Sequence, residues 1–346
     1  MDNLAHALVG AALGRVVGDE RVPAPALLGA IAANAPDWLE LVVGGRWRPD
    51  NYLLSHRGIT HSLIGALVQA VAFTLVTGAV LTWRARRGGP PPRWGWLAVL
   101  FFVTVASHLY MDWQGSYGLR PFLPWNPKWY YGDWVAIVDP FYWFVPLVAL
   151  AWGGRRHWRP GMWWTILLLP PLLLVVLSRT PALWVQAASL GIVIVGVIGW
   201  HRHWFGVAAR RAGAVAALGV LAAYTLAQVA VGTVVQHRAH AAALARFGPT
   251  ATSGAMTIPG RPFQWDVLLA SHDTVAGDGW SVARHLDDPN VRRALASAEG
   301  VTMSHFSRFL VAVVDTTPTG PVVQFRDARY ARTSRGGFAT RRVRVP

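Results

Sequence analysis

His108 and Asp112 form the pair of ionisable residues whose spacing most directly suggests chemistry. They stand four residues apart at the end of an apolar run, within the sequence Ser-His-Leu-Tyr-Met-Asp of residues 107–112. In a helix this spacing places both side chains on one face, where they can bind one metal ion or two neighbouring ions. The alternative is a hydrogen-bonded pair that caps the helix at an interface. Because ionisable groups beside an apolar helix are costly and usually functional, the pattern favours a metal site.

His56 and His61 flank a short turn, in the sequence His-Arg-Gly-Ile-Thr-His of residues 56–61. Gly58 permits the turn, and Thr60 can cap the helix that follows. A turn followed by a helix start can direct both imidazoles at one point, as ligands of one ion. Two histidines in an arbitrary loop would more often have no such role.

Asp37 and His6 are two further candidate ligands in the N-terminal apolar stretches. Asp37 follows Pro36 within an otherwise apolar segment, and we predict a ligand there rather than a surface residue of a proline turn. His6 lies one turn into a helix that Asp2 or Asn3 can cap. A lone histidine on an apolar helix is more often a buried core residue. With the other candidates present, we predict that His6 is a ligand as well.

Asp133 and Asp139 are the candidates for the catalytic carboxylate. Either could orient a ligating imidazole, bind metal itself or act as a general base. Asp139 precedes Pro140, so it also fits a plain helix N-cap.

Three basic residues near these ligands in sequence, Arg57, Arg120 and Lys128, could hold an anionic substrate. His272 and Asp273, far along the chain, lack a second cluster at useful spacing. The chemistry is therefore expected in residues 1–140.

The elements that carry these residues read as membrane helices. Only 14% of the 346 residues are charged and 53% are hydrophobic, whereas soluble domains carry about 25% charged residues. A bilayer-spanning helix needs about 20 mostly apolar residues. Six runs meet or approach this length, of which the last named is the weakest: 61–83, 94–112, 162–178, 182–200, 213–235 and 135–152. Two shorter stretches, 4–17 and 24–43, predict half-helices, tilted helices or interfacial helices.

Arginine placement predicts an orientation in the membrane. The loops at 84–93, 153–160 and 201–211 are rich in arginine, and the Trp-rich turn at 113–134 between two of the runs is not. The positive-inside rule makes those three loops cytoplasmic, so the candidate ligands and the chain after residue 236 face outward. Arginine-rich cytoplasmic loops explain the formal net charge of +15 better than a stripe of basic residues that binds a nucleic-acid groove. Nucleic acid is therefore not expected as a partner.

The composition and hydrophobic pattern of the sequence change from about residue 258. Residues 309–314 have strand composition and residues 322–327 alternate, with glycine and Asp-Pro turns between such runs. We therefore expect an all-α multi-span membrane domain over residues 1–240 and a small extracytoplasmic β-rich or α+β domain over residues 241–346.

Several of these strings, in order, resemble the YdjM-like family of inner-membrane, metal-dependent hydrolases, some of them LexA-binding. The resemblance is close over about residues 1–140 and rests on residues 1–10, 34–37, 56–62, 107–112 and 117–122. It implies a metal-dependent hydrolase in the inner membrane. The His-x-x-x-Asp pair with upstream Asp and His is also loosely similar to zinc-dependent phospholipase C enzymes, which suggests phosphodiester chemistry. Trp38 stands where a second acidic or small residue is expected, so the number of ligands from that turn stays open.

Together these observations predict a hydrolase embedded in the plasma membrane that acts at its outer face on a phosphoester or lipid-linked substrate. The chain has no cysteine, so any metal must be held by His, Asp or Glu. Zinc suits such a site best, with manganese or iron as alternatives, and one or two ions are expected. The predicted ligands are His6, Asp37, His56, His61, His108 and Asp112.

Two other classes of function remain open. A metal or proton transporter would need acidic groups deep in several helices, and the absence of any acid in residues 140–235 counts against it. A non-catalytic regulatory or binding protein of the membrane, of the LexA-binding kind, would instead act through a cytoplasmic surface.

Overall fold

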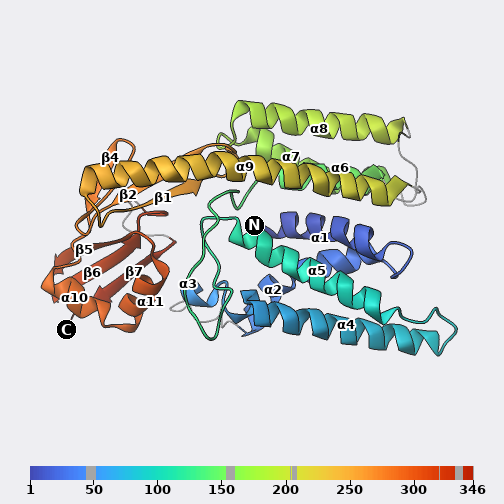
Figure 1. The fold of residues 1–346 in the computed structure, drawn as a ribbon, viewed down its shortest axis with the longest axis horizontal. Helices are drawn as coiled ribbons and strands as arrows, with labels where there is room; N and C mark the ends of the chain where they lie inside the picture. The colour runs from blue at the N-terminus through green and yellow to red at the C-terminus, as the bar shows by residue number, and fades with distance from the viewer. Residues whose placement is uncertain are drawn as a thin grey trace. The chain divides into compact units, whose positions relative to one another are not determined.

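The structure is a computed structural model that describes residues 1–43, 52–152, 160–202, 204, 209–318, 320–331 and 338–345. The N-terminal part of the chain is mostly helical (Figure 1). Its helices are α1 (Asn3–Gly18), α2 (Pro25–Val43), α3 (Tyr52–Ser55), the 3-10 helix η2 (Ile59–His61), α4 (Leu63–Ala85), α5 (Trp94–Trp113), α6 (Pro140–Trp152), α7 (Pro160–Leu177), α8 (Leu183–His201) and α9 (Arg210–Phe247).

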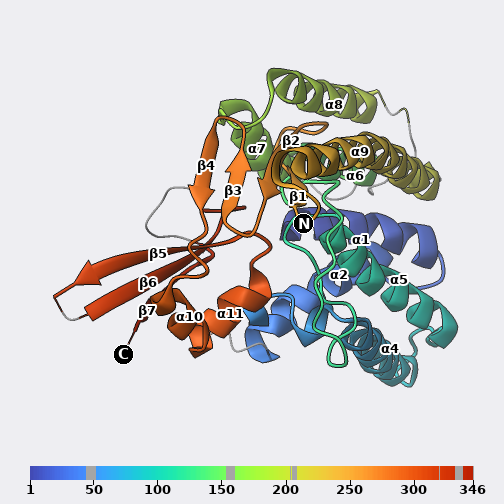
Figure 2. The same cartoon turned by 60° about the vertical axis from the view of Figure 1, so that its left-hand side comes forward.

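The C-terminal part carries two small sheets and two short helices (Figure 2). The elements are β1 (Thr252–Thr257), β2 (Trp265–Ala270), β3 (Thr274–Gly277), β4 (Trp280–Ala283), α10 (Pro289–Leu295), α11 (Ala298–Phe306), β5 (Leu310–Thr317), β6 (Gly320–Asp327) and β7 (Thr340–Arg344). One sheet has the strand order β1-β2-β3-β4 and the other β5-β6-β7. The long hairpin of β5 and β6 pairs Val313 with Gln324, and β7 adds Val343 opposite Val323. A small β-rich C-terminal part, as predicted, is present.

The chain divides into two compact units. The first comprises Met1–Leu39, Ile59–Val229 and Thr257–Phe263, and the second Glu40–Gly58, Ala230–Met256 and Gln264–Pro346. Helix α9 continues to Phe247, past residue 240 where the sequence analysis ended the helical domain.

Four helices among the described residues are long and apolar enough to cross a bilayer, namely α4, α5, α8 and α9. The prediction of six spans is therefore not supported. Helix α6 has 13 residues, which extend about 20 Å, short of a hydrocarbon core of about 30 Å. The apolar stretch described in α7, Leu168–Leu177, is shorter still.

The composition of α6 reflects burial in protein rather than a crossing of the bilayer. Its Tyr142, Trp143, Phe144 and Leu147 belong to the hydrophobic core of the first unit. An apolar run is equally consistent with lipid and with a protein interior, so hydropathy alone does not separate the two cases.

One end of the first unit gathers arginine. Arg210 Nε donates to Asp19 Oδ2 at 2.6 Å, and Arg93 Nη1 donates to the Glu20 carbonyl at 3.5 Å. The end of α1 and the starts of α5 and α9 therefore lie together. Figure 1 shows the α1–α2 and α4–α5 connections at this same end, which we call the arginine end.

The opposite end of the first unit is built from the loop between α5 and α6. Leu63 N donates to the Pro121 carbonyl at 2.9 Å, and Gly132 N donates to the Trp113 carbonyl at 2.8 Å. The start of α4 and the end of α5 therefore meet this loop, and we call this the loop end.

Candidate metal centre

Four of the predicted ligands bring their donor atoms together at the loop end of the first unit. Asp37 comes from α2, His61 from η2, and His108 and Asp112 from the last turns of α5. One ligand atom from each residue lies within 4.8 Å of the others. His61, His108 and Asp112 are buried, and the Asp37 side chain is 17% exposed.

The donor atoms alternate between imidazole and carboxylate. His61 Nε2 lies 3.1 Å from Asp37 Oδ1 and 3.5 Å from Asp112 Oδ2, and His108 Nε2 lies 3.7 Å and 3.4 Å from the same two oxygens. Around a tetrahedral ion with bonds of about 2.0–2.2 Å, neighbouring donor atoms stand about 3.3–3.6 Å apart. The four His–Asp separations match four of the six edges of such a tetrahedron to within a few tenths of an ångström.

The tautomer of His108 is set by the backbone of α2. The Nδ1 atom of His108 lies 2.6 Å from the carbonyl oxygen of Ala33, which can only accept a hydrogen bond. Nδ1 therefore carries the proton, and the lone pair of Nε2 faces the cluster. His108 Nε2 is buried without a hydrogen-bond partner among the described residues. A histidine that donates its other ring N–H to a carbonyl is the usual arrangement of a metal ligand.

His61 is held by its neighbour and by the short helix that bears it. Its Nδ1 lies 3.0 Å from Thr60 Oγ1, which leaves Nε2 toward the carboxylates. Ser62 caps α4 by accepting from Gly65 N at 3.0 Å, so η2 ends where α4 begins. Burial lowers the pKa of His61, which favours the neutral imidazole that metals bind.

His6 adds a fifth nitrogen donor beside the cluster. Its ring stacks on that of His108 with centroids 3.9 Å apart, and its Nε2 lies 3.4 Å from Asp112 Oδ1. Both ring nitrogens of His6 are buried without a hydrogen-bond partner among the described residues. Burial, together with the neighbouring His108, lowers the pKa of His6 to about 3, so this imidazole is neutral at pH 7. Asp112 Oδ1 also accepts from the amino group of Met1 at 2.5 Å.

The chemistry of the donor set fits a divalent cation. Neutral imidazoles with unpartnered nitrogens beside carboxylates offer lone pairs and negative charge, and unsatisfied buried polar atoms are otherwise costly. An ion at the cluster would give His108 Nε2, and His6 Nε2 beside it, the partner that neither has among the described residues. The residues that would hold an ion are Asp37, His61, His108 and Asp112, with His6 adjacent.

His56, predicted as a ligand together with His61, is not a member of the four-residue cluster. Its Nδ1 lies 2.9 Å from Glu40 Oε1, and Glu40 Oε2 accepts from Arg57 N at 3.0 Å. These residues belong to the second unit. Glu40 was missed in the sequence analysis, although an acid in the apolar stretch 24–43 was a signal that could have indicated a partner for His56.

Asp133 lies beside the end of the helix that carries His108 and Asp112. It is buried, and its φ of 56° places it in the left-handed region. The residues on either side of it, Gly132 and Trp134, donate their N–H groups to the carbonyls of Trp113 and Gln114. The backbone thus fixes this carboxylate at the loop end.

Both carboxylate oxygens of Asp139 accept hydrogen bonds at the start of α6. Its Oδ1 accepts from Phe141 N at 2.9 Å and its Oδ2 accepts from the Tyr224 hydroxyl at 2.6 Å. It is not a member of the four-residue cluster. The N-cap alternative from the sequence thus describes its contacts.

Asp139 predicts a pH dependence of stability. Burial raises the pKa of its carboxyl to about 6 from an ordinary value of 3.8, with a contribution from the charge of Asp2. The folded chain therefore binds this proton more tightly than the unfolded chain. The resulting stability, roughly 2–3 kcal/mol, is fully present below about pH 4 and is lost as pH rises through about 6. Asp139→Asn is expected to lose this dependence, so its Tm relative to the native chain rises between pH 4 and 7.

Thermal unfolding of detergent-purified protein at several pH values measures this difference. Asp278→Asn, at an exposed carboxyl between β3 and β4, is the matched control and should run parallel to the native chain. Equal pH slopes for Asp139→Asn and the native chain would contradict the assignment.

Arg120 and Lys128, predicted to hold an anionic substrate, lie on the loop between α5 and α6. The Arg120 guanidinium lies 4.7 Å from the ring centroid of Trp129, and Lys128 Nζ lies 5.5 Å from that of Tyr130. Burial lowers the pKa of Arg120. The third predicted residue, Arg57, is buried in the second unit.

A second group of donors, His272, Asp273 and Asp287, lies in the second unit. All three side chains are exposed, and Asp287 Oδ1 accepts from Arg292 at 2.6 Å. Exposed groups of this kind are ordinary surface features, so the buried cluster is the better site.

Comparison with known proteins agrees with the resemblance seen in the sequence. The family model described as YdjM inner membrane protein matches residues 1–185, which include every member of the buried cluster. No curated protein and no solved structure gives a significant match. Since the family model covers more than half of the chain, the protein belongs to the YdjM inner membrane protein family.

Proposed function

We propose that the protein is a membrane-embedded, metal-dependent hydrolase whose centre is formed by Asp37, His61, His108 and Asp112. The observation that carries this proposal is the geometry of the four donor atoms, with His–Asp separations of 3.1–3.7 Å and a His108 lone pair aimed among them. Two imidazoles and two carboxylates suit zinc best, and manganese or iron would also be accommodated.

The bound ion would supply Lewis acidity toward the scissile oxygen and would lower the pKa of water. The protein's own side chains would supply the general base and set the side from which substrate approaches. Asp133, held at the loop end by its backbone, is the candidate base, since Asp139 is already engaged by Tyr224 and the α6 backbone. Asp37 is the most exposed of the four ligands, so substrate would approach from its side.

The surroundings favour an anionic, amphipathic substrate such as a phosphoester or a lipid-linked molecule. Arg120 and Lys128 supply positive charge on the loop between α5 and α6. Exposed aromatic side chains of the same loop, Phe122 and Trp125, suit the interface between lipid and water.

The arginine end is proposed to face the cytoplasm, because clustered arginines flank cytoplasmic helix ends. His108 and Asp112 lie in the last turns of α5, at the loop end, whereas Arg93 precedes the first. The cluster would then lie at the outer face of the inner membrane.

Spheroplasts that overproduce the chain test the activity and the orientation together. They are expected to hydrolyse bis(p-nitrophenyl) phosphate, a membrane-impermeant phosphodiester, before permeabilisation. His61→Ala should lower the rate at least about 100-fold because a ligand is removed. His305→Ala, at an exposed histidine of α11, should leave the rate unchanged.

The outcomes separate the two parts of the proposal. Hydrolysis that requires permeabilisation would reverse the orientation and leave the hydrolase intact. Hydrolysis that His61→Ala does not diminish would place the activity elsewhere, and absence of hydrolysis of phosphodiesters altogether would leave the cluster as a binding site only.

A further inference from the structure

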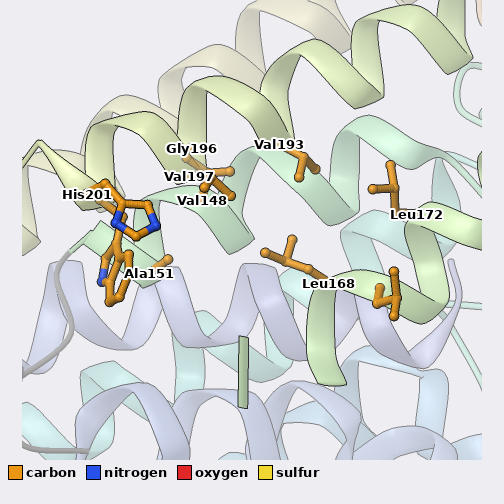
Figure 3. A pocket seen from close by; sticks show the side chains of 10 residues that line it. Val148, Ala151, Leu168, Leu172, Val193, Gly196, Val197 and His201 are labelled. Carbon is orange, nitrogen blue, oxygen red and sulfur yellow. The ribbon is translucent and has the colours of Figure 1, made fainter. Parts of the chain in front are cut away.

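An apolar groove of about 290 Å³ lies between α6, α7 and α8 (Figure 3). Val148 of α6 and Val193 of α8 are buried in its wall, and Gly196 of α8 packs directly against Val148, because a Cβ built at Gly196 would lie 2.6 Å from Val148 Cγ2. The lining residues on α8 recur at Val193, Gly196, Val197 and Trp200, which share one helix face. The groove therefore runs along the helix axis, over about 12 Å from Val193 to His201.

The groove opens on the outside of the first unit. Leu169 of α7 and Val197 of α8 line it and are 45% and 43% exposed. Helix α8 is one of the four candidate membrane spans, so its exposed apolar surface faces hydrocarbon. An empty groove in such a surface forfeits dispersion contacts along its walls, and a flexible hydrocarbon chain restores them.

One end of the groove is basic. The start of α8 lies at the loop end, because Ala182 N donates to the Gly260 carbonyl and Gly260 N to the Val138 carbonyl. The groove occupies the other half of α8 and ends at His201, which lines it, and Arg202, which follows. It thus lies toward the arginine end, away from the metal centre.

The basic side chains described near this end outnumber the acidic ones. Residues 140–265 contain no acidic residue, and the nearest elements at the arginine end begin with Arg210 and Arg211 of α9. Asp19 and Glu20 are the acids at the arginine end; Asp19 is paired with Arg210 at 2.6 Å, and Glu20 is exposed in the turn that follows α1. Basic side chains at a membrane face attract anionic lipid headgroups.

We infer that this groove binds one acyl chain of an anionic phospholipid, with its phosphate at His201 and Arg202. The lipid belongs to the leaflet at the arginine end. This site is separate from the metal centre and does not depend on the proposed hydrolase activity.

Native mass spectrometry of the delipidated full chain tests this inference. The protein is titrated with phosphatidylglycerol or phosphatidylcholine that carry identical acyl chains. Phosphatidylglycerol is expected to bind more tightly. Arg202→Gln should weaken the phosphatidylglycerol adduct about fivefold and the phosphatidylcholine adduct by less than about twofold, because the choline ammonium already offsets the phosphate charge. Ala151→Phe, which fills the groove, should remove both adducts.

Ala187→Phe makes the same change at an exposed position of α8 outside the groove and should retain both adducts. Equal affinity for the two lipids, or full binding to Ala151→Phe, would overturn the inference. Photocrosslinking of the native chain provides a test that no misfolding can obscure. A phosphatidylglycerol with a diazirine on its acyl chain should label residues 148–151 and 193–201, and equal labelling of the exposed face of α4 would contradict a defined site.

Discussion

Detergent-purified protein is expected to carry about one divalent ion per chain, and His108→Ala is expected to lose it. The reason is that Nε2 of His108 is the donor whose lone pair the Ala33 carbonyl aims into the cluster. Removing this ligand leaves three of the four donors, and even loss of an outer-shell partner lowers metal affinity 10–100-fold. Elemental analysis of protein purified without chelator measures the effect. Loss of the ion should also lower the Tm, because a ligand that binds only the folded state stabilises it.

Asp112→Asn offers an independent version of the same test. The amide is nearly isosteric with the carboxylate but carries no negative charge, so it should weaken metal binding with less change in packing. His305→Ala, on the exposed face of α11, should keep the full metal content. Equal metal content in the native chain and in His108→Ala would exclude His108 as a ligand.

The local part of the cluster follows from the sequence, since four-residue spacing in a helix is fixed by geometry. His108 and Asp112 occupy one face of α5 for this reason, and both donate atoms to the cluster. The meeting of these two residues with His6, Asp37 and His61 is a property of tertiary packing. Sequence order and predicted sidedness made it a reasonable expectation, and no local pattern could place the atoms.

Other features of the site had no signal in the sequence. The carbonyl of Ala33 sets the tautomer of His108, and any residue type supplies a carbonyl. His56 and His61 look equivalent in the turn of residues 56–61, yet His56 pairs with Glu40. Each imidazole pairs with the acid of α2 that the path of the chain brings near it. The local sequence does not determine that path.

The fold shows the same division between local and non-local information. Hydropathy gave most helices of the first unit, including the two short N-terminal ones, nearly to their ends, but it ended the last run at residue 235 whereas α9 continues to Phe247. It did not separate spans from core helices, because α6 buries its aromatic side chains against protein. Helix length, 13 residues in α6, is the quantity that distinguishes the two cases.

The close packing of α1 against α2 is the non-local contact on which the cluster most depends. A Cβ built at Gly29 would lie 2.2 Å from the Gly10 carbonyl oxygen, and one built at Gly10 would lie 2.5 Å from the Gly29 oxygen. The two backbones therefore touch, as small residues allow in membrane helix pairs. His6 on α1 and Asp37 on α2 are brought to the same site by this contact.

Gly29→Ala is consequently expected to destabilise the protein by about 1–3 kcal/mol. The added methyl group would clash with backbone atoms, which cannot move aside by changing rotamer as a side chain can. Separating α1 from α2 should also move His6 and Asp37 apart and weaken metal binding. Competition with a chelator of known affinity measures the second effect, and thermal unfolding measures the first.

Gly191→Ala in α8 is the matched control, since nothing lies within 4 Å of a Cβ built there. In an open helical position the same change removes the flexibility of glycine and should stabilise the protein by up to about 1 kcal/mol. The two variants thus differ in sign although their chemistry is identical. If Gly29→Ala instead stabilised the chain and kept its affinity for metal, α1 and α2 would not be in backbone contact, and the position of His6 beside His108 would lose its structural support.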